Sequence, residues 1–182
     1  MRTIADHLYD IAMNSVKAGA KNVYVSIRED TDKNEFYFSV KDDGSGISEE
    51  KLIKVFDPFY TTRDKKIRKV GLGLPLLKQN TEITGGYTKI SSKENEGTYT
   101  EALFYTNNID AIEKGDIAGS VHGLVVSSDW IDWYIKIEKN ELKEEISTLE
   151  IRDALGGLSF QNIEVMQALM NIFREIAENI GI

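Results

Sequence analysis

The sequence predicts an α+β fold, an α/β sandwich in which helices cover one face of a mixed, mainly antiparallel sheet. Two pairs of segments alternate apolar and polar residues, at 23–40 and 87–104, and a polar turn interrupts each pair. Segments with helical spacing lie before and between these pairs. Helices that alternate with antiparallel hairpins favour two layers, with the helices on one side.

The first predicted element is a helix over residues 3–17. Thr3 is available as its N-cap, and its apolar positions recur at three- and four-residue spacing. These positions are Ile4, Leu8, Ile11, Ala12, Ser15 and Val16. Residues 23–28 and 35–40 then alternate around the polar turn 29–34, which predicts a hairpin. Residues 49–56 fit a short helix.

The middle of the chain repeats this order. Residues 69–86 give a glycine-rich entry followed by a helix, because Pro75 suits the first turn and the glycine pair Gly85-Gly86 suits its end. Two further strands are predicted near 87–92 and 98–104, and the turn-rich segment 93–97 joins them.

A polar segment, residues 106–116, interrupts the pattern, and we place a boundary there. The predicted division is a first domain at 1–107 and a small α/β C-terminal extension at 108–182. Within the extension we expect a helix at 117–125, a strand at 132–138, and a final amphipathic helix from about Ile163.

The extension has no segment that indicates a chemical role, and we expect it to bind a partner or to dimerise. Ser147 and Glu150 fit a capping box for a further helix that runs to Gly156. Trp130, Trp133 and Tyr134 are candidates for a binding surface, and we expect at least one of the two tryptophans in the core.

Composition excludes several classes of function. The net charge of −8 argues against a general nucleic-acid surface, and the absence of cysteine excludes disulfides and thiolate metal sites. No run of about 18 apolar residues could span a membrane, so we expect a cytoplasmic protein without a membrane segment. One window, Arg63 to Lys69, holds five basic residues and one acid. It is either a solvated loop or a local anion site.

The clearest polar motif is Asp42-x-Gly44-x-Gly46, directly after a predicted strand. Such a strand end is either a plain turn or a binding site for a base. A carboxylate at the mouth of a strand can accept the exocyclic amine of adenine, and nearby glycines let the base approach the backbone. The residues of this motif alone leave both interpretations open.

Four segments in order carry a resemblance to a known family: 10–20 (DIAMNSVKAGA), 42–46 (DDGSG), 56–63 (FDPFYTTR) with VGLGL after it, and 96–98 (EGT). Together they resemble the nucleotide-binding boxes of the GHKL ATPase superfamily, which contains histidine kinases, gyrase, heat-shock chaperones and mismatch-repair ATPases. The third segment is most similar to the catalytic domain of histidine kinases.

This resemblance implies a Bergerat-type ATP-binding fold that holds ATP and Mg²⁺. Asp42 would recognise adenine, Thr98 would reach the base through water, and Asn14 would supply an amide oxygen to the metal. The glycine run before the third helix would bind phosphate at the helix N-terminus. The implied nucleotide-binding residues are Asn14, Asp42, Gly44, Gly46, Ile47, Phe56, Thr61, Thr62, Gly71, Leu72, Gly73, Leu74 and Thr98.

Asp10 is the implied catalytic residue. In the hydrolysing branches of the superfamily a glutamate at this position activates water, and Asp10 is one methylene shorter. It is therefore a general base, a carboxylate on the helix surface, or a residue that supports the metal from outside its ligand set.

The expected function is signalling with Mg-ATP, as a stand-alone protein kinase that acts on a separate partner or as a slow ATPase. The alternative is a non-catalytic ATP sensor whose lid closure regulates the docking of a partner protein. His7 and His122 do not lie in a recognisable phospho-acceptor motif, so we expect any acceptor on another chain. A homodimer is a further expectation.

Overall fold

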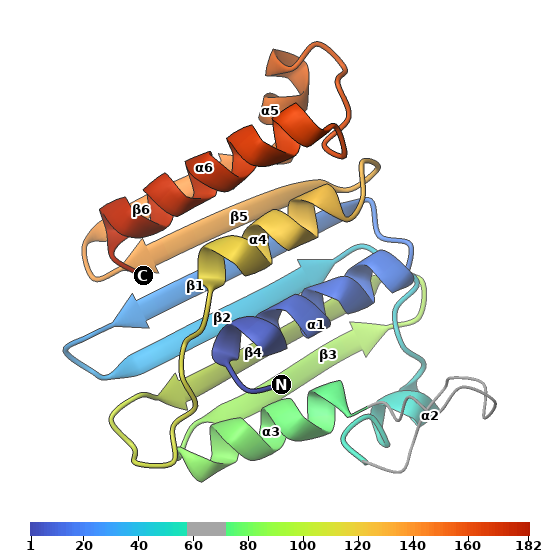
Figure 1. Cartoon of the computed structure of the whole chain (residues 1–182). Coiled ribbons are helices and arrows are strands. Elements are labelled where there is room, and N and C mark those ends of the chain that lie inside the picture. The colour runs from blue at the N-terminus through green and yellow to red at the C-terminus, as the bar shows by residue number, and fades with distance from the viewer. Residues whose placement is uncertain (58–71) are drawn as a thin grey trace.

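The computed structural model describes residues 1–57 and 72–182, and its centre is a six-stranded sheet (Figure 1). The strand order is β3-β4-β2-β1-β5-β6. Only the β1–β5 pair is parallel among these neighbours, so the sheet is mixed and mainly antiparallel, as predicted. The strands are β1 (Asn22–Asp30), β2 (Glu35–Asp42), β3 (Tyr87–Lys93), β4 (Gly97–Tyr105), β5 (Asp132–Lys139) and β6 (Leu142–Ser147).

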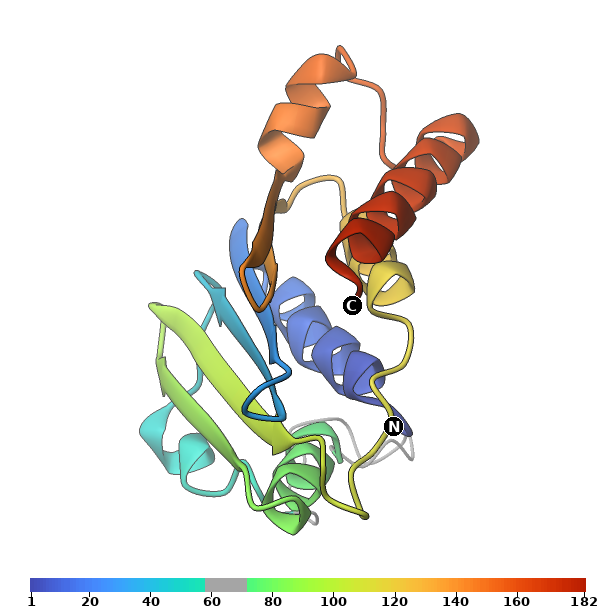
Figure 2. The same ribbon diagram turned by 90° about the vertical axis from the view of Figure 1, so that its left-hand side faces the viewer.

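Four helices cover one face of this sheet, which confirms the predicted two layers (Figure 2). They are α1, α3, α4 and α6, and the short α2 and α5 lie at two ends of the molecule. The helices are α1 (Ile4–Lys17), α2 (Glu49–Leu52), α3 (Gly73–Ile83), α4 (Ile117–Val126), α5 (Thr148–Ala154) and α6 (Ile163–Ile180). None of the helices in the described ranges is long and apolar enough to cross a membrane.

Side chains of alternating strand positions form the core between the two layers. In β1, Val23, Val25 and Ile27 are buried, and the residues between them face the other side of the sheet. That other face is open, and Tyr24 of β1 stacks on Tyr134 of β5 with ring centroids 4.7 Å apart.

Local capping explains where α1 begins. The Thr3 side chain accepts from the backbone N–H of Asp6, and the Asp6 carboxylate accepts from the backbone N–H of Thr3, so the predicted cap forms a full capping box. The capping box predicted for α5 is wrong, because Ser147 precedes that helix but makes no side-chain cap bond. Its neighbour Thr148 instead accepts from the backbone N–H of Trp133, at 2.8 Å.

Residues after 108 extend the same sheet. Strand β5 pairs in parallel with β1, with Val25 opposite Ile135, and α4 packs on α1. Glu29 of β1 also bonds Lys114 at 2.9 and 3.0 Å, and it pairs with Lys139 of β5 at 3.4 Å. Residues 108–182 are thus joined to residues 1–107 by backbone, apolar and ionic contacts.

The two tryptophans of the extension differ in burial, as expected. Trp133 is fully buried between sheet and helices, and Trp130 is 64% exposed. The first confirms a tryptophan in the core, and the second stays a candidate for a surface contact.

Candidate functional site

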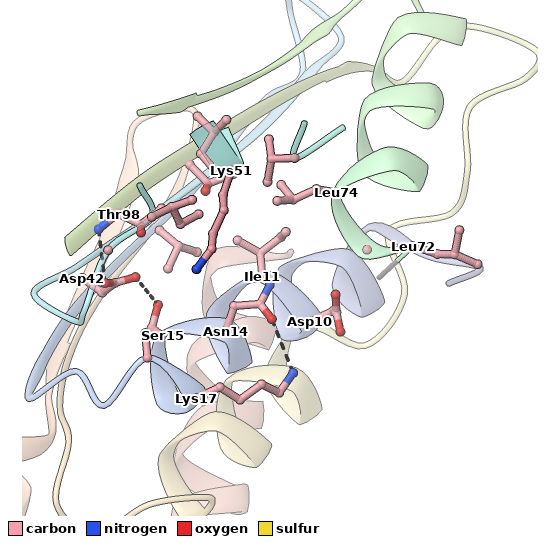
Figure 3. Close-up of a pocket in the computed structure, with 18 of the residues that line it drawn as sticks. Asp10, Ile11, Asn14, Ser15, Lys17, Asp42, Lys51, Leu72, Leu74 and Thr98 are labelled. Carbon is pink, nitrogen blue, oxygen red and sulfur yellow. Dashed lines mark hydrogen bonds between the residues drawn. The ribbon is translucent and has the colours of Figure 1, made fainter. Parts of the chain in front are cut away.

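A cavity of about 670 Å³ opens between α1, α2, the first turn of α3 and the ends of β2 and β4 (Figure 3). This volume lies within the range typical of small-molecule sites. Its polar and charged lining among the described residues is Asp10, Asn14, Ser15, Lys17, Asp42, Lys51, Thr98 and Thr100. Its apolar lining includes Ile11, Val40, Ile47, Val55, Leu72, Leu74, Leu76 and Ile90.

Asp42 is held in place at the inner end of the cavity. Its Oδ2 accepts a hydrogen bond from Ser15 Oγ at 2.7 Å, and its Oδ1 accepts from the backbone N–H of Gly44 at 2.9 Å and of Thr98 at 3.2 Å. The residue is only 8% exposed. A carboxylate has about four lone-pair sites, so these three donors leave about one for a further donor.

The neighbouring acid Asp43 has a different role. Burial raises its pKa, but hydrogen bonds from Asn22 and from the backbone N–H of Lys21 outweigh this effect and hold the pKa below its usual range. These bonds close the loop that follows α1. Asp43 therefore stabilises the loop, and it is Asp42 that faces the cavity.

Helix α1 supplies the polar floor of the cavity. Asp10, Asn14 and Lys17 lie on one side of the helix, at spacings of four and three residues. The Lys17 amine donates to Asn14 Oδ1 at 3.4 Å. An amide oxygen and an amine therefore lie side by side on this floor.

The first turn of α3 closes the opposite end. A methyl group built on Gly73 would lie 2.0 Å from Asp10 Oδ2, so only a glycine allows this close approach. Leu72 is the N-cap of α3 and makes no side-chain cap bond. Backbone N–H groups in the first turn of a helix have no intrahelical partner, and they favour anions.

The wall opposite α1 is fixed by a small network. Ser92 Oγ accepts from the backbone N–H of Ile47 at 2.8 Å, donates to Gly97 O at 2.8 Å, and lies 2.9 Å from Thr98 Oγ1. Gly46, just before this contact, has φ of +63°, a conformation that favours glycine. The loop after β2 is thereby tied to the start of β4.

Most of the predicted binding residues in the described ranges meet at this cavity. Gly44 does not line it but donates its N–H to Asp42. Phe56 lies in a neighbouring groove beside the outer face of α3, where the Lys78 amine lies 5.0 Å from its ring centroid. Those that line the cavity, with the predicted catalytic Asp10, are Asp10, Asn14, Asp42, Gly46, Ile47, Leu72, Gly73, Leu74 and Thr98. Thr61, Thr62, Gly71 and the basic window 63–69 lie outside the described residues.

Four polar residues of the lining, Ser15, Lys17, Lys51 and Thr100, did not follow from the sequence as site residues. The helical spacing predicts Ser15 on the apolar side of its helix, and its contact with Asp42 spans 27 positions. Lys17 and Lys51 have the sequence context of ordinary surface lysines. The spacing of Lys17 from Asn14, three residues along a helix, is the one signal that could have indicated it.

A metal ion at this cavity would have few ligands from protein side chains. Within residues 1–57 and 72–182, no group of three or more His, Asp or Glu side chains could hold a metal ion. Mg²⁺ needs few protein ligands when it also binds phosphates and water, and Asn14 Oδ1 is the amide oxygen placed at this cavity.

Comparison with known proteins agrees with this geometry. A family model described as "Histidine kinase-, DNA gyrase B-, and HSP90-like ATPase" matches residues 2–108. The sensor protein kinase WalK of Staphylococcus epidermidis is 32% identical over 119 residues, which cover 64% of this chain and 19% of that protein. A WalK sequence from Staphylococcus aureus is also 32% identical over 119 residues, covering 64% of this chain and 28% of that one. The match thus spans less than a third of each of these relatives.

A solved structure supports the fold. The N-terminal domain of a DNA repair protein superposes with a TM-score of 0.58 at 12% identity, and the match covers 81% of this chain and 53% of that one. The family match covers more than half of the sequence and includes the helices and strands that line the cavity in the described ranges, which are α1, α2, α3, β2, β3 and β4. The chain therefore belongs to the family of histidine kinase-, DNA gyrase B- and HSP90-like ATPases.

Proposed function

We propose that this protein binds Mg-ATP in the cavity between α1 and α3 and uses it for signalling, by phosphorylating a separate protein or by slow hydrolysis. The observation that carries the proposal is the hydrogen bonding of the Asp42 carboxylate. It accepts three hydrogen bonds from the protein and keeps about one acceptor site at a cavity with mainly aliphatic walls.

Adenine fits this end of the cavity. Its exocyclic amine would donate to Asp42, and its flat faces would pack on aliphatic side chains such as Ile47 and Ile90. Thr98 borders the same end and offers a hydroxyl for a water-mediated contact.

The triphosphate would extend toward the N-terminus of α3. The free N–H groups of its first turn favour anions, but the Asp10 carboxylate beside Gly73 repels them. A cation held by Asn14 Oδ1 would offset this repulsion, and Mg²⁺ supplies that charge when bound. The same position of Asp10 allows it to take a proton from an attacking water, which is the requirement for hydrolysis.

A phosphate acceptor on another chain fits the positions of the two histidines. His7 is fully buried and contacts Asn80, with 2.8 Å between His7 Nε2 and Asn80 Nδ2. His122 is 9% exposed, and its Nε2 lies 2.9 Å from the carbonyl oxygen of Met166. Phosphoryl transfer needs the acceptor in line with the phosphate, which neither packed side chain offers.

A second candidate function is a nucleotide sensor without catalysis. It is favoured by the packing of α1, which lines the cavity on one side and contacts the C-terminal extension on the other. Ser120 Oγ of α4 donates to the carbonyl oxygen of Ala5 at 3.2 Å. A shift of α1 on ATP binding would therefore move the surface of the extension, where a partner would dock.

Single-turnover incubation with γ-labelled ATP distinguishes these functions. A kinase would transfer label to a partner encoded beside it, and an ATPase would release labelled phosphate more slowly in Asp10→Asn. A sensor would bind ATP and do neither. Acid-labile label on the isolated chain, lost in His7→Ala or His122→Ala, would contradict the acceptor argument. Absence of ATP binding by calorimetry would refute the proposal as a whole.

A further inference from the structure

Lys51 extends from α2 over the cavity (Figure 3). Figure 3 draws its side chain reaching from α2 toward the space between Asp42 and Asn14. Helix α2 begins after Ser48, whose carbonyl oxygen accepts from the backbone N–H groups of Lys51 and Leu52, at 3.0 and 2.9 Å. The Ile47 N–H that bonds Ser92 fixes the chain just before it.

The amine of Lys51 has no protein acceptor in the described part of the chain. No hydrogen bond or ion pair joins it to residues 1–57 or 72–182, and the residue is exposed. Lys17, the other lysine of the cavity, already donates to Asn14 Oδ1. Lys51 is thus the cavity lysine whose three N–H groups are available to a ligand.

The charge of the lining makes this amine important. Among the side chains of the described lining residues, two acids, Asp10 and Asp42, balance two bases, Lys17 and Lys51. A polyanion that enters this cavity meets no net attraction from these four groups. Without Lys51 the same groups would carry a net charge of −1, and like charges in a partly enclosed site repel strongly.

We propose that Lys51 is a nucleotide-binding residue that donates to the sugar–phosphate part of the ligand, near the ribose and first phosphate. This inference rests on the proposed function, because it takes the base to lie at Asp42 and the terminal phosphate to lie at α3. The amine reaches into the space between these two ends. A compact ammonium on a flexible stem suits a phosphate oxygen, which it contacts as a point charge.

Calorimetric titration of Lys51→Met with ATP, ADP and adenosine tests the proposal. ATP and ADP should each bind about 5- to 20-fold more weakly than to the wild type, and adenosine should change by less than about twofold. Lys51→Arg should recover most of the loss, since it keeps the charge. Raising the salt concentration should weaken ATP binding less in Lys51→Met than in the wild type.

Lys54→Met is the matched control, because Lys54 lies one turn further along and does not line the cavity. It should leave all three affinities within about twofold. Unchanged ATP affinity in Lys51→Met, or equal losses for ATP and adenosine, would overturn the assignment of Lys51. Failure of the wild type to bind any of the three ligands would instead remove the proposed function itself, so the two failures are distinguishable.

Discussion

Ser15 Oγ lies 2.7 Å from Asp42 Oδ2 and donates a hydrogen bond to it, which ties helix α1 to the last residue of β2. Both side chains are buried, with exposures of 1% and 8%. The bond fixes the carboxylate plane, so the remaining acceptor site has a defined direction. A defined acceptor direction is what separates recognition of one base from general affinity for nucleotides.

Asp42→Asn should weaken ATP binding by about 1 to 3 kcal/mol, a factor of about 5 to 150. The amide that replaces one oxygen would set N–H groups against the donors of Ser15, Gly44 or Thr98. Titration calorimetry measures the loss. Ser15→Ala keeps the carboxylate and should cost less than Asp42→Asn. Equal affinities for wild type and Asp42→Asn would contradict the adenine assignment.

Asn14→Ala should weaken binding of ATP far more in Mg²⁺ than in EDTA. The variant removes the amide oxygen proposed as the metal ligand, and it leaves Asp42 and Lys51 in place. Paired titrations in the two buffers give the ratio directly. Lys17→Met is a useful companion because it removes the donor to Asn14 Oδ1 without removing the oxygen. The same loss in both buffers would argue against a metal role.

Gly73→Ala should push the Asp10 carboxylate out of its position. The new methyl group would lie 2.0 Å from Asp10 Oδ2, and the side chain can turn away at a cost of about 1 kcal/mol in the free energy of unfolding. In an Asp10→Ala background the same glycine change should cost almost nothing. Urea denaturation of the wild type, Gly73→Ala, Asp10→Ala and the double variant gives the coupling free energy between the two positions. Additive effects would show that the two residues do not touch in solution.

His7 predicts a pH dependence of stability. Burial lowers its pKa from 6.5 to about 4 in the folded protein, so the unfolded chain binds more protons between these values. The stabilisation is therefore complete above pH 6.5 and declines as the pH falls toward 4. Through this histidine, the free energy of unfolding should be about 2 kcal/mol lower at pH 5 than at pH 8.

His7→Gln is the matched variant for this measurement, because its amide oxygen can still accept from Asn80. Urea denaturation at pH 5 and pH 8 should show a smaller difference between the two pH values in this variant than in the wild type. Carboxylates titrate in both proteins and cancel in the comparison. Identical pH profiles would mean that His7 does not contribute to the pH dependence of stability.

The sequence predicted most of the helices and strands because their periodicity reflects one buried face. Strand β6 was missed, since Leu142 is 53% exposed and Ile146 is its one buried residue, so charged side chains hide the alternation. The parallel pairing of β5 with β1 could not be predicted, because it joins strands more than 100 positions apart. For the same reason the sequence indicated Asp42 and Asn14 but not Lys51, whose approach to the cavity depends on where α2 packs.

The parallel strand β5 has a further consequence for how this chain can be shortened. A protein cut near residue 108, where the family match ends, would lose β5 and leave β1 with an unpaired row of backbone N–H and C=O groups. That row would run beside Val23, Val25 and Ile27, and exposed apolar strands of this kind recruit further copies. The C-terminal extension thus covers the edge of β1, and we expect a chain cut at residue 108 to form β-paired oligomers more readily than the full chain.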